Sequence, residues 1–316
     1  MIASKPLLTN KFELRFFGAL GAILLLLVFF SIIADNKVER GNESIPSKIV
    51  RNHFENLDIK AKAVYVLDVR TGKVLYQKNS DTRMPLASLT KVMRALVATD
   101  LAPEISTVIV SNDAIKIEGN SGLRANEKWN LKELLDFSLT SSSNDGMTAV
   151  AFALGALHKT NSTNIDAEND FVNLMNMKAD ALNMKNTYYL NVTGLDESEV
   201  KNGAYGTAYD MVTLFEHILK NKPSLLDATR QSTLNLVSLD NIVHKIQNTD
   251  QVVANIPGIK ASKTGFTDIA GGNLVIAFDP ELGRPIIIAV LGSTQEDRFS
   301  DIEKLVEASL QTISEL

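Results

Sequence analysis

The sequence predicts an α+β fold, in which one antiparallel sheet is built from both ends of the chain, flanked by helices and joined to a helical lobe. Strand-like segments lie near residues 61–77 and again at 259–291, and the region between them is mostly helical in its apolar spacing. Strands at both ends with helices inserted between them indicate a sheet covered by helices. No boundary divides this region into independent domains.

Composition narrows the class of protein. A chain of 316 residues with 45% apolar and 22% charged residues has ample material for a hydrophobic core. A net charge of −5, without any Lys/Arg-rich run, gives no reason to expect a nucleic-acid partner. The absence of cysteine excludes disulfides and thiol catalysis. No metal-binding motif is present, and the four histidines are scattered at His53, His158, His217 and His244.

An uncharged apolar segment lies near the N-terminus. Residues 16–33 are long enough, at about 1.5 Å per residue, to reach across the roughly 30 Å of a hydrocarbon core. Basic residues precede this segment and mixed charges follow it, so the positive-inside rule places residues 1–15 in the cytoplasm. Residues 34–44 form a linker, and a globular body at 45–316 lies on the far side of the membrane. A cleaved signal peptide is the alternative, but its apolar region is usually about 7–15 residues.

Within the globular body, the expected elements follow in order. A helix at 45–57 precedes a β-hairpin at 61–68 and 74–77, whose turn is Arg70-Thr-Gly-Lys73. The remaining helices are expected at 85–98, 131–139, 145–157, 167–182, 208–219 and 301–313. The remaining strands are expected at 259–264, 273–278 and 285–291.

A short motif lies at the start of the helix at 85–98. Its apolar residues from Leu89 to Val97 recur at i, i+3, i+4, i+7 and i+8, which predicts a buried amphipathic helix. Ser88 and Lys91 are three residues apart and therefore share one face. A hydroxyl beside an amine is what a Ser/Lys nucleophile pair requires, although an N-cap serine with a solvated lysine is the alternative. A second copy, Ser198-Glu-Val-Lys201, lies in a polar stretch without helical periodicity.

A lysine acts as a base only when it is neutral, and burial or a second nearby cation lowers its pKa. Lys263-Thr264-Gly265, at the end of an expected strand, is the one Lys-Ser/Thr-Gly sequence in the chain. Lys263 and Thr264 could hold a substrate carboxylate. Gly265 would let a peptide lie against the strand edge as an added strand. An ordinary strand-end turn is the alternative interpretation.

A third candidate motif, Ser142-Ser143-Asn144, lies between two expected helices. Ser142 could relay a proton between Lys91 and a leaving group, and Asn144 could bond a substrate amide. Helix caps and loop residues of the same types are common, so capping is the alternative. A similar triplet, Ser162-Thr163-Asn164, occurs in a polar loop.

Taken together, these motifs resemble the serine D-alanyl-D-alanine carboxypeptidases, the low-molecular-mass penicillin-binding proteins related to β-lactamases. The resemblance covers roughly residues 61–313 and implies a β-lactamase/DD-peptidase-like fold. Beyond the three motifs it is carried by Val64–Asp68 with Thr71-Gly72, Ala181–Thr187, Gly194-Leu-Asp196, Thr207–Met211 and Ala270–Leu274.

The resemblance also implies roles for individual residues. Ser88 is expected to be the nucleophile and Lys91 the general base. The second motif is Ser142 with Asn144, and the third is Lys263, Thr264 and Gly265. The backbone N–H groups of Ser88 and Phe266 would form the oxyanion hole. Arg298 would help to bind the terminal carboxylate of the substrate, a solvated surface arginine being the alternative.

The implied function is a membrane-anchored serine-type carboxypeptidase that removes the terminal D-alanine from peptidoglycan stem peptides ending in D-Ala-D-Ala. It would act outside the cytoplasmic membrane, need no cofactor, and be inhibited covalently by β-lactams. Three alternatives are a D-alanyl endopeptidase, a non-catalytic penicillin- or peptidoglycan-binding protein, and a class A-like β-lactamase. The last requires a Glu-x-x-Leu-Asn sequence, which Glu168-Asn-Asp-Phe-Val172 does not match.

Overall fold

The computed structural model describes residues 52–155 and 163–315. Its helices are α2 (Thr90–Leu101), α3 (Leu131–Ser141), α4 (Asn144–Gly155), α5 (Asn164–Ala181), α6 (Ala208–Asn221) and α7 (Asp297–Ser314), with 3-10 turns η1 (Ala87–Leu89), η2 (Ala114–Lys116), η3 (Pro223–Arg230) and η4 (Val253–Asn255). Its strands are β1 (Ala63–Asp68), β2 (Lys73–Lys78), β3 (Met84–Pro85), β4 (Thr107–Ile109), β5 (Lys128–Asn130), β6 (Tyr188–Tyr189), β7 (Asp196–Ser198), β8 (Lys201–Asn202), β9 (Ala204–Gly206), β10 (Thr233–Val237), β11 (Val243–Gln247), β12 (Ile259–Thr267), β13 (Gly271–Phe278) and β14 (Ile286–Ser293).

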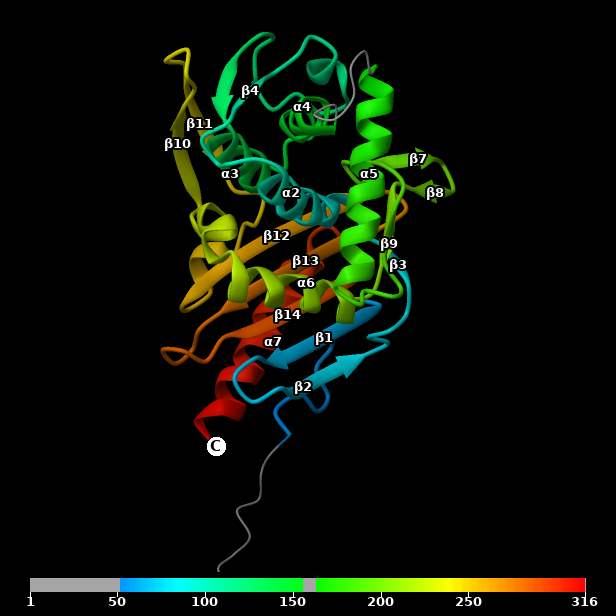
Figure 1. The fold of residues 1–316 in the computed structure, drawn as a ribbon. Coiled ribbons are helices and arrows are strands. Elements are labelled where there is room, and N and C mark those ends of the chain that lie inside the picture. Colours follow the sequence, from blue (N-terminus) through cyan, green and yellow to red (C-terminus); the bar gives the residue numbers. More distant parts are fainter. Residues whose placement is uncertain (1–51, 156–162, 316) are drawn as a thin grey trace, which may run out of the picture. The chain divides into compact units, whose positions relative to one another are not determined.

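The central feature is a five-stranded antiparallel sheet in the order β12-β13-β14-β1-β2 (Figure 1). The pairing of β1 with β14 joins segments from opposite ends of the chain, with Val64 opposite Val290. This confirms the predicted sheet and its hairpin. β12 forms one edge of the sheet, so the strand that carries the Lys-Thr-Gly sequence has one side free of sheet pairing.

The two faces of the sheet are covered by different helices. Alternate residues such as Ala289 and Leu291 of β14 join a core cluster with α6, whereas Ile288 and Val290 join a second cluster with α7. Figure 1 shows α6 in front of the sheet and α7 behind it. Every residue of β14 is buried, because both of its faces are covered. A sheet packed on both sides is a rigid support for groups carried on its edge.

Helices α2, α3, α4 and α5 form the predicted helical lobe beside β12. Aromatic residues from separate segments fill part of its core: Trp129 of β5 packs against Phe137 of α3 at 5.5 Å between ring centroids. The β10–β11 hairpin was not predicted. Only every second residue of its strands is buried or half-buried, and one buried position is polar, His244.

One expected element is wrong over its described part. Residues 52–57 of the helix expected at 45–57 form a turn. The Asn52 side chain accepts a hydrogen bond from the Phe54 N–H at 3.2 Å, and Asn56 has a φ of 63°. An Asx-type contact followed by a left-handed residue does not continue a helix.

The predicted tail at 1–15, membrane segment at 16–33 and linker at 34–44 lie outside the described residues. Within the ranges 52–155 and 163–315, no helix combines the length and apolar character needed to cross a membrane.

Candidate active site

Ser88 and Lys91 meet at the junction between η1 and α2. The 3-10 turn presents the half-buried Ser88 hydroxyl, and Lys91 follows in the first turn of α2. Lys91 Nζ lies 2.7 Å from Ser88 Oγ and 3.0 Å from the Thr193 carbonyl oxygen. The Lys91 side chain is fully buried, which rules out the solvated-lysine interpretation.

The backbone before Ser88 is unusual. Ala87 has a φ of 49°, in the left-handed region that residues with a Cβ seldom adopt. The Ala87 carbonyl oxygen accepts a hydrogen bond from Thr90 Oγ1 at 2.7 Å, which holds the turn. A strained residue at this point directs the Ser88 hydroxyl out of the helix start, where another molecule can reach it.

Ser142 and Asn144 occupy the junction of α3 and α4. Ser142 ends α3 in the left-handed region, with a φ of 60°, and its Oγ accepts a hydrogen bond from Lys263 Nζ at 2.9 Å. Asn144 Nδ2 donates to the Glu118 carbonyl oxygen at 2.7 Å. Asn144 Oδ1 is buried and has no hydrogen-bond partner among the described residues.

The Lys-Thr-Gly sequence lies on β12 beside the Ser88 turn. Lys263 is buried, and Thr264 Oγ1 lies 2.6 Å from Thr249 Oγ1. A Cβ atom on Gly265 would lie 2.9 Å from the Leu86 carbonyl oxygen and 3.3 Å from the Ser88 nitrogen. Gly265 is therefore needed for close packing of β12 against η1, a requirement that the sequence motif did not reveal.

The surroundings of the two lysines lower the pKa of both amines. Burial, the positive charge of Lys263 and that of Arg94 hold the pKa of Lys91 well below its usual value, and the Asp145 charge opposes them. Burial and the Arg298 charge lower the pKa of Lys263 to about 7. The lowered pKa of Lys91 favours the unprotonated amine, which can accept a proton from the hydroxyl 2.7 Å away.

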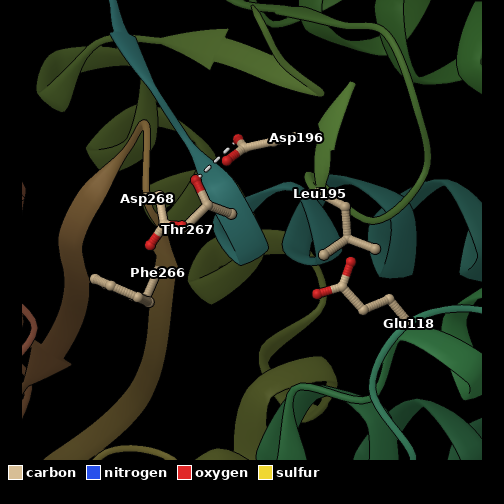
Figure 2. A pocket seen from close by; sticks show the side chains of 6 residues that line it. All are labelled: Glu118, Leu195, Asp196, Phe266, Thr267 and Asp268. Carbon is tan, nitrogen blue, oxygen red and sulfur yellow. Dashed lines mark hydrogen bonds between the residues drawn. The ribbon is translucent and has the colours of Figure 1, made fainter. Parts of the chain in front are cut away.

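Arg298 and Phe266 flank the Lys-Thr-Gly strand. Arg298 Nη1 donates to the Gly265 carbonyl oxygen at 2.9 Å, and the residue is only 6% exposed, so the surface-arginine alternative is wrong. The side chain of Phe266 is 40% exposed. It lines a pocket of about 230 Å³ next to the Ser88 site, together with Glu118, Leu195, Asp196, Thr267 and Asp268 (Figure 2).

Direct contacts thus join Ser88 with Lys91 and Ser142 with Lys263. Asn144, Thr264, Gly265 and Phe266 lie on the same segments, whereas Arg298 reaches the Gly265 carbonyl from α7. The second Ser-x-x-Lys sequence and the similar Ser-Thr-Asn triplet lie in different surroundings. Ser198 and Lys201 lie on the exposed β7–β8 hairpin, and Thr163 caps α5, its Oγ1 accepting from the Asp166 N–H at 3.2 Å.

Sequence reasoning missed several residues that hold this site. Thr193 supplies a carbonyl to Lys91, Thr249 pairs with Thr264, and Asp145 accepts hydrogen bonds from the Ser121 and Ser143 hydroxyls. Asp145 directly follows the Ser142–Asn144 triplet, so it could have been found. Thr193 acts through its backbone carbonyl, and Thr249 through a contact with the side chain of Thr264. A single sequence carries no signal for either contact.

The fold and the arrangement of hydroxyls and lysines are similar to those of the penicillin-binding proteins. Among solved structures, penicillin-binding protein D2 of Listeria monocytogenes in its ampicillin-bound form is similar, with a TM-score of 0.64 and 28% identity. The match covers 80% of this chain and 98% of that one.

Within this class, the chain belongs to the D-alanyl-D-alanine carboxypeptidase family, whose family model matches residues 50–295. It is 30% identical over 257 residues to D-alanyl-D-alanine carboxypeptidase DacF of Bacillus subtilis, covering 78% of this chain and 61% of that protein. It is also 31% identical over 225 residues to a D-alanyl-D-alanine endopeptidase of Pseudomonas aeruginosa, covering 69% and 67%. The chain therefore spans less than two thirds of the length of the Bacillus relative.

Proposed function

We propose that the protein is a serine-type D-Ala-D-Ala carboxypeptidase, which removes the terminal D-alanine from peptidoglycan stem peptides through an acyl-enzyme on Ser88. The observation that carries this proposal is the 2.7 Å contact between Ser88 Oγ and the buried amine of Lys91. The family membership supports the same chemistry.

In the first step, neutral Lys91 takes the Ser88 proton while Ser88 Oγ attacks the carbonyl carbon of the penultimate D-alanine. The negative charge that develops on the carbonyl oxygen is stabilised by the backbone N–H groups of Ser88 and Phe266. Loss of one such donor costs about 3 kcal/mol in related enzymes. The close packing of Gly265 against η1 supports this role, because it sets the spacing between the two donors.

In the second step, the peptide C–N bond breaks and the departing amine of D-alanine needs a proton. Ser142 accepts a hydrogen bond from Lys263 at 2.9 Å, which makes its hydroxyl a relay for the proton held by Lys91. Asn144 bonds a substrate amide once its side chain turns, because its unpartnered Oδ1 is buried in the arrangement described. Water then attacks the ester on Ser88, and the shortened peptide leaves.

The terminal carboxylate of the substrate is the group that Lys263, Thr264 and Arg298 recognise. Thr264 offers its hydroxyl on β12. Arg298 lies behind the Gly265 carbonyl and supplies positive charge at short range. Its guanidinium is mostly buried, so it acts through its charge more than through an exposed surface.

A β-lactam would acylate the same hydroxyl and leave slowly. Class A-like turnover needs a glutamate that activates water beside the acyl-enzyme. Glu168 is on α5, and its charge acts on Arg94 behind Lys91. We therefore expect a long-lived penicilloyl adduct on Ser88, seen as the added mass of one penicillin molecule in intact mass spectrometry.

The N-terminal apolar segment at 16–33 is proposed as a membrane tether that keeps residues 45–316 outside the cytoplasm. A chain recovered in the membrane fraction, with its C-terminus accessible to protease added outside the membrane, would support this topology. Cleavage after the apolar segment by signal peptidase would instead indicate a secreted protein without a tether.

The activity itself is tested by D-alanine release. The 316-residue chain in detergent is given a tripeptide mimic ending in D-Ala-D-Ala, with Ser88→Ala as the inactive control. Release by the wild type and none by the variant supports the proposal. If the wild type releases no D-alanine but still forms the penicillin adduct, a binding protein is the better interpretation.

An endopeptidase is the second candidate, because the similar Pseudomonas aeruginosa relative carries that name. Both activities pass through the same acyl-enzyme and differ in the leaving group. Incubation with D-alanyl-cross-linked muropeptides separates them: cleavage of the cross-link faster than release of free D-alanine would favour the endopeptidase.

A further inference from the structure

Arg94 lies directly behind the proposed catalytic pair and takes no part in the mechanism above. It follows Lys91 by one turn of α2 and is completely buried. Arg94 Nη1 donates to the Val192 carbonyl oxygen at 2.9 Å, and Lys91 Nζ donates to the next carbonyl, that of Thr193, at 3.0 Å. The Arg94 guanidinium and the Lys91 amine are therefore held by the carbonyls of two consecutive residues.

The Arg94 guanidinium is poorly compensated. Its Nε and Nη2 atoms have no hydrogen-bond partner among the described residues. Its other close neighbour is the Phe171 ring, 5.6 Å from the guanidinium carbon. Burial lowers the pKa of Arg94, and the Glu168 charge on α5 opposes this effect. A buried charge with so few partners destabilises a fold, so its presence calls for another explanation.

Three elements place charged groups toward Lys91. Lys263 comes from β12, Arg94 from α2 and Asp145 from α4. Asp145 is occupied by hydrogen bonds from the Ser121 and Ser143 hydroxyls, and no ion pair joins it to Lys91 among the described residues. The two cations therefore face Lys91 from two sides. Both act against the protonated amine.

We propose that Arg94 is a positioning residue whose fixed positive charge keeps the neighbouring Lys91 amine unprotonated, ready to accept the proton of Ser88. The inference rests on the proposed role of Lys91 as general base. A guanidinium suits this task better than a second lysine, because it stays protonated where a buried lysine releases its proton.

A purely structural role for Arg94 leads to the opposite result on stability. If the guanidinium only tied α2 to the Val192 loop, its removal would destabilise the fold. If it is retained for its charge, replacement by an apolar chain of similar length relieves an unfavourable burial. Arg94→Met should then unfold at the wild-type temperature or above, while losing activity at low pH.

The test compares pH profiles for acylation by a fluorescent penicillin in the full chain. Without the neighbouring cation, Lys91 holds its proton to higher pH, so the acidic limb of the acylation rate should move upward by about one pH unit in Arg94→Met. Arg94→Lys retains a positive charge at this position as long as the new amine is protonated. It should therefore shift the acidic limb less than Arg94→Met does. Arg70→Met, at an exposed position of the β1–β2 turn, is the matched control and should leave the limb in place.

A second measurement does not depend on catalysis. The 13Cε NMR signal of Lys91, assigned by its loss in Lys91→Met, reports the ionisation of the amine directly. Its titration should move to higher pH in Arg94→Met. Identical Lys91 titrations in wild type and Arg94→Met would overturn the inference, even if no penicillin reacts. If Lys91 titrates at higher pH in Arg94→Met but the wild type is never acylated, only the proposed function is overturned.

Discussion

The chain contains the Ser-x-x-Lys spacing twice, and the two copies differ in almost everything except spacing. Ser88 lies on a 3-10 turn that leads into a buried helix, and Lys91 Nζ reaches its hydroxyl at 2.7 Å. Ser198 ends β7 and Lys201 begins β8, where the two are cross-strand partners on an exposed hairpin. Among the residues that the structure describes, the Ser198 hydroxyl accepts one long hydrogen bond, from the Val200 N–H at 3.4 Å.

The difference indicates that environment, more than spacing, decides whether a Ser/Lys pair can exchange a proton. Lys201 is exposed on its hairpin, whereas burial and the Lys263 charge disfavour the protonated form of Lys91. A protonated lysine cannot accept a proton from a hydroxyl. The same three-residue spacing is therefore a possible base–nucleophile pair in one place and a surface hairpin in the other.

The largest expected effect is the loss of acylation on removing one hydroxyl. Ser88→Ala should abolish labelling by a fluorescent penicillin, a decrease of at least about 10⁴-fold. Ser198→Ala is the matched control and should label at the wild-type rate. Labelling retained in Ser88→Ala and lost in Ser198→Ala would reverse the assignment of the two copies.

The next effect concerns stability and pH. The pKa of Lys263 is lowered to about 7 in the folded chain, whereas an unfolded lysine has a pKa of about 10.4. Between these values the unfolded chain binds the extra proton, so stability should rise with pH across that window and stay flat below it. Lys263→Met should remove this part of the slope and stabilise the fold by about 2 to 4 kcal/mol at pH 6.

Chemical denaturation at several pH values measures this effect, with Lys201→Met as the exposed control. The control should show the wild-type slope. The stabilisation in Lys263→Met should shrink toward zero above about pH 11, where both states have largely lost the proton. A variant less stable than wild type by the same amount at every pH would show that Lys263 is held by favourable contacts instead.

Much of the fold was accessible from the sequence because it depends on local periodicity. The hairpin at 63–78, the buried helix after Ser88 and the strand that carries Lys263 are each encoded by residues close together in the chain. The β10–β11 hairpin was missed although Leu234 and Leu236 alternate with polar residues. Its second strand obscures the pattern, because it buries the polar His244 and exposes the apolar Val243.

The residue types of the site could be predicted from the sequence, but their geometry could not. Lys263 lies 121 positions from Ser142 in the chain, yet the two side chains are hydrogen-bonded. A contact of that kind depends on how the whole sheet packs against the lobe. The left-handed φ of Ser142 and the burial of Arg298 are likewise set by tertiary packing, which local patterns do not record.

A smaller effect tests the approach of β12 to the Ser88 turn. In Gly265→Ala, the added Cβ would meet the Leu86 carbonyl oxygen at 2.9 Å, and a backbone atom cannot move as easily as a side chain. The strand should shift away, lowering the acylation rate by about 10- to 100-fold, since small displacements at a reaction centre have effects of this size. Gly72→Ala, where a Cβ meets nothing within 4 Å, controls for the loss of a glycine, with strain expected from its φ of 69°.

The stopped-flow acylation rate measures the Gly265→Ala effect, and denaturation separates it from unfolding. Gly72→Ala should lose stability through its own backbone, but its acylation rate should match that of the wild type because Gly72 lies in the β1–β2 turn. An unchanged rate in Gly265→Ala would mean that the strand and the turn tolerate a wider separation than their packing implies.

The smallest effect concerns the residue before each serine. Ala87 has a φ of 49°, whereas Glu197, before Ser198, is in the ordinary strand conformation of β7. Ala87→Gly relieves the left-handed strain of about 1–2 kcal/mol. It also removes a buried methyl, at about 0.8 kcal/mol, and adds freedom to the unfolded chain, at about 0.5–1 kcal/mol.

These terms nearly cancel, so Ala87→Gly should change the free energy of unfolding by less than about 1 kcal/mol. Ala87→Val should destabilise the fold by more than about 2 kcal/mol, because a β-branched residue tolerates a positive φ poorly. Denaturation of both variants gives the comparison. If Ala87→Val were as stable as wild type, the turn would not be strained, and the orientation of the Ser88 hydroxyl would have to come from its contact with Lys91 alone.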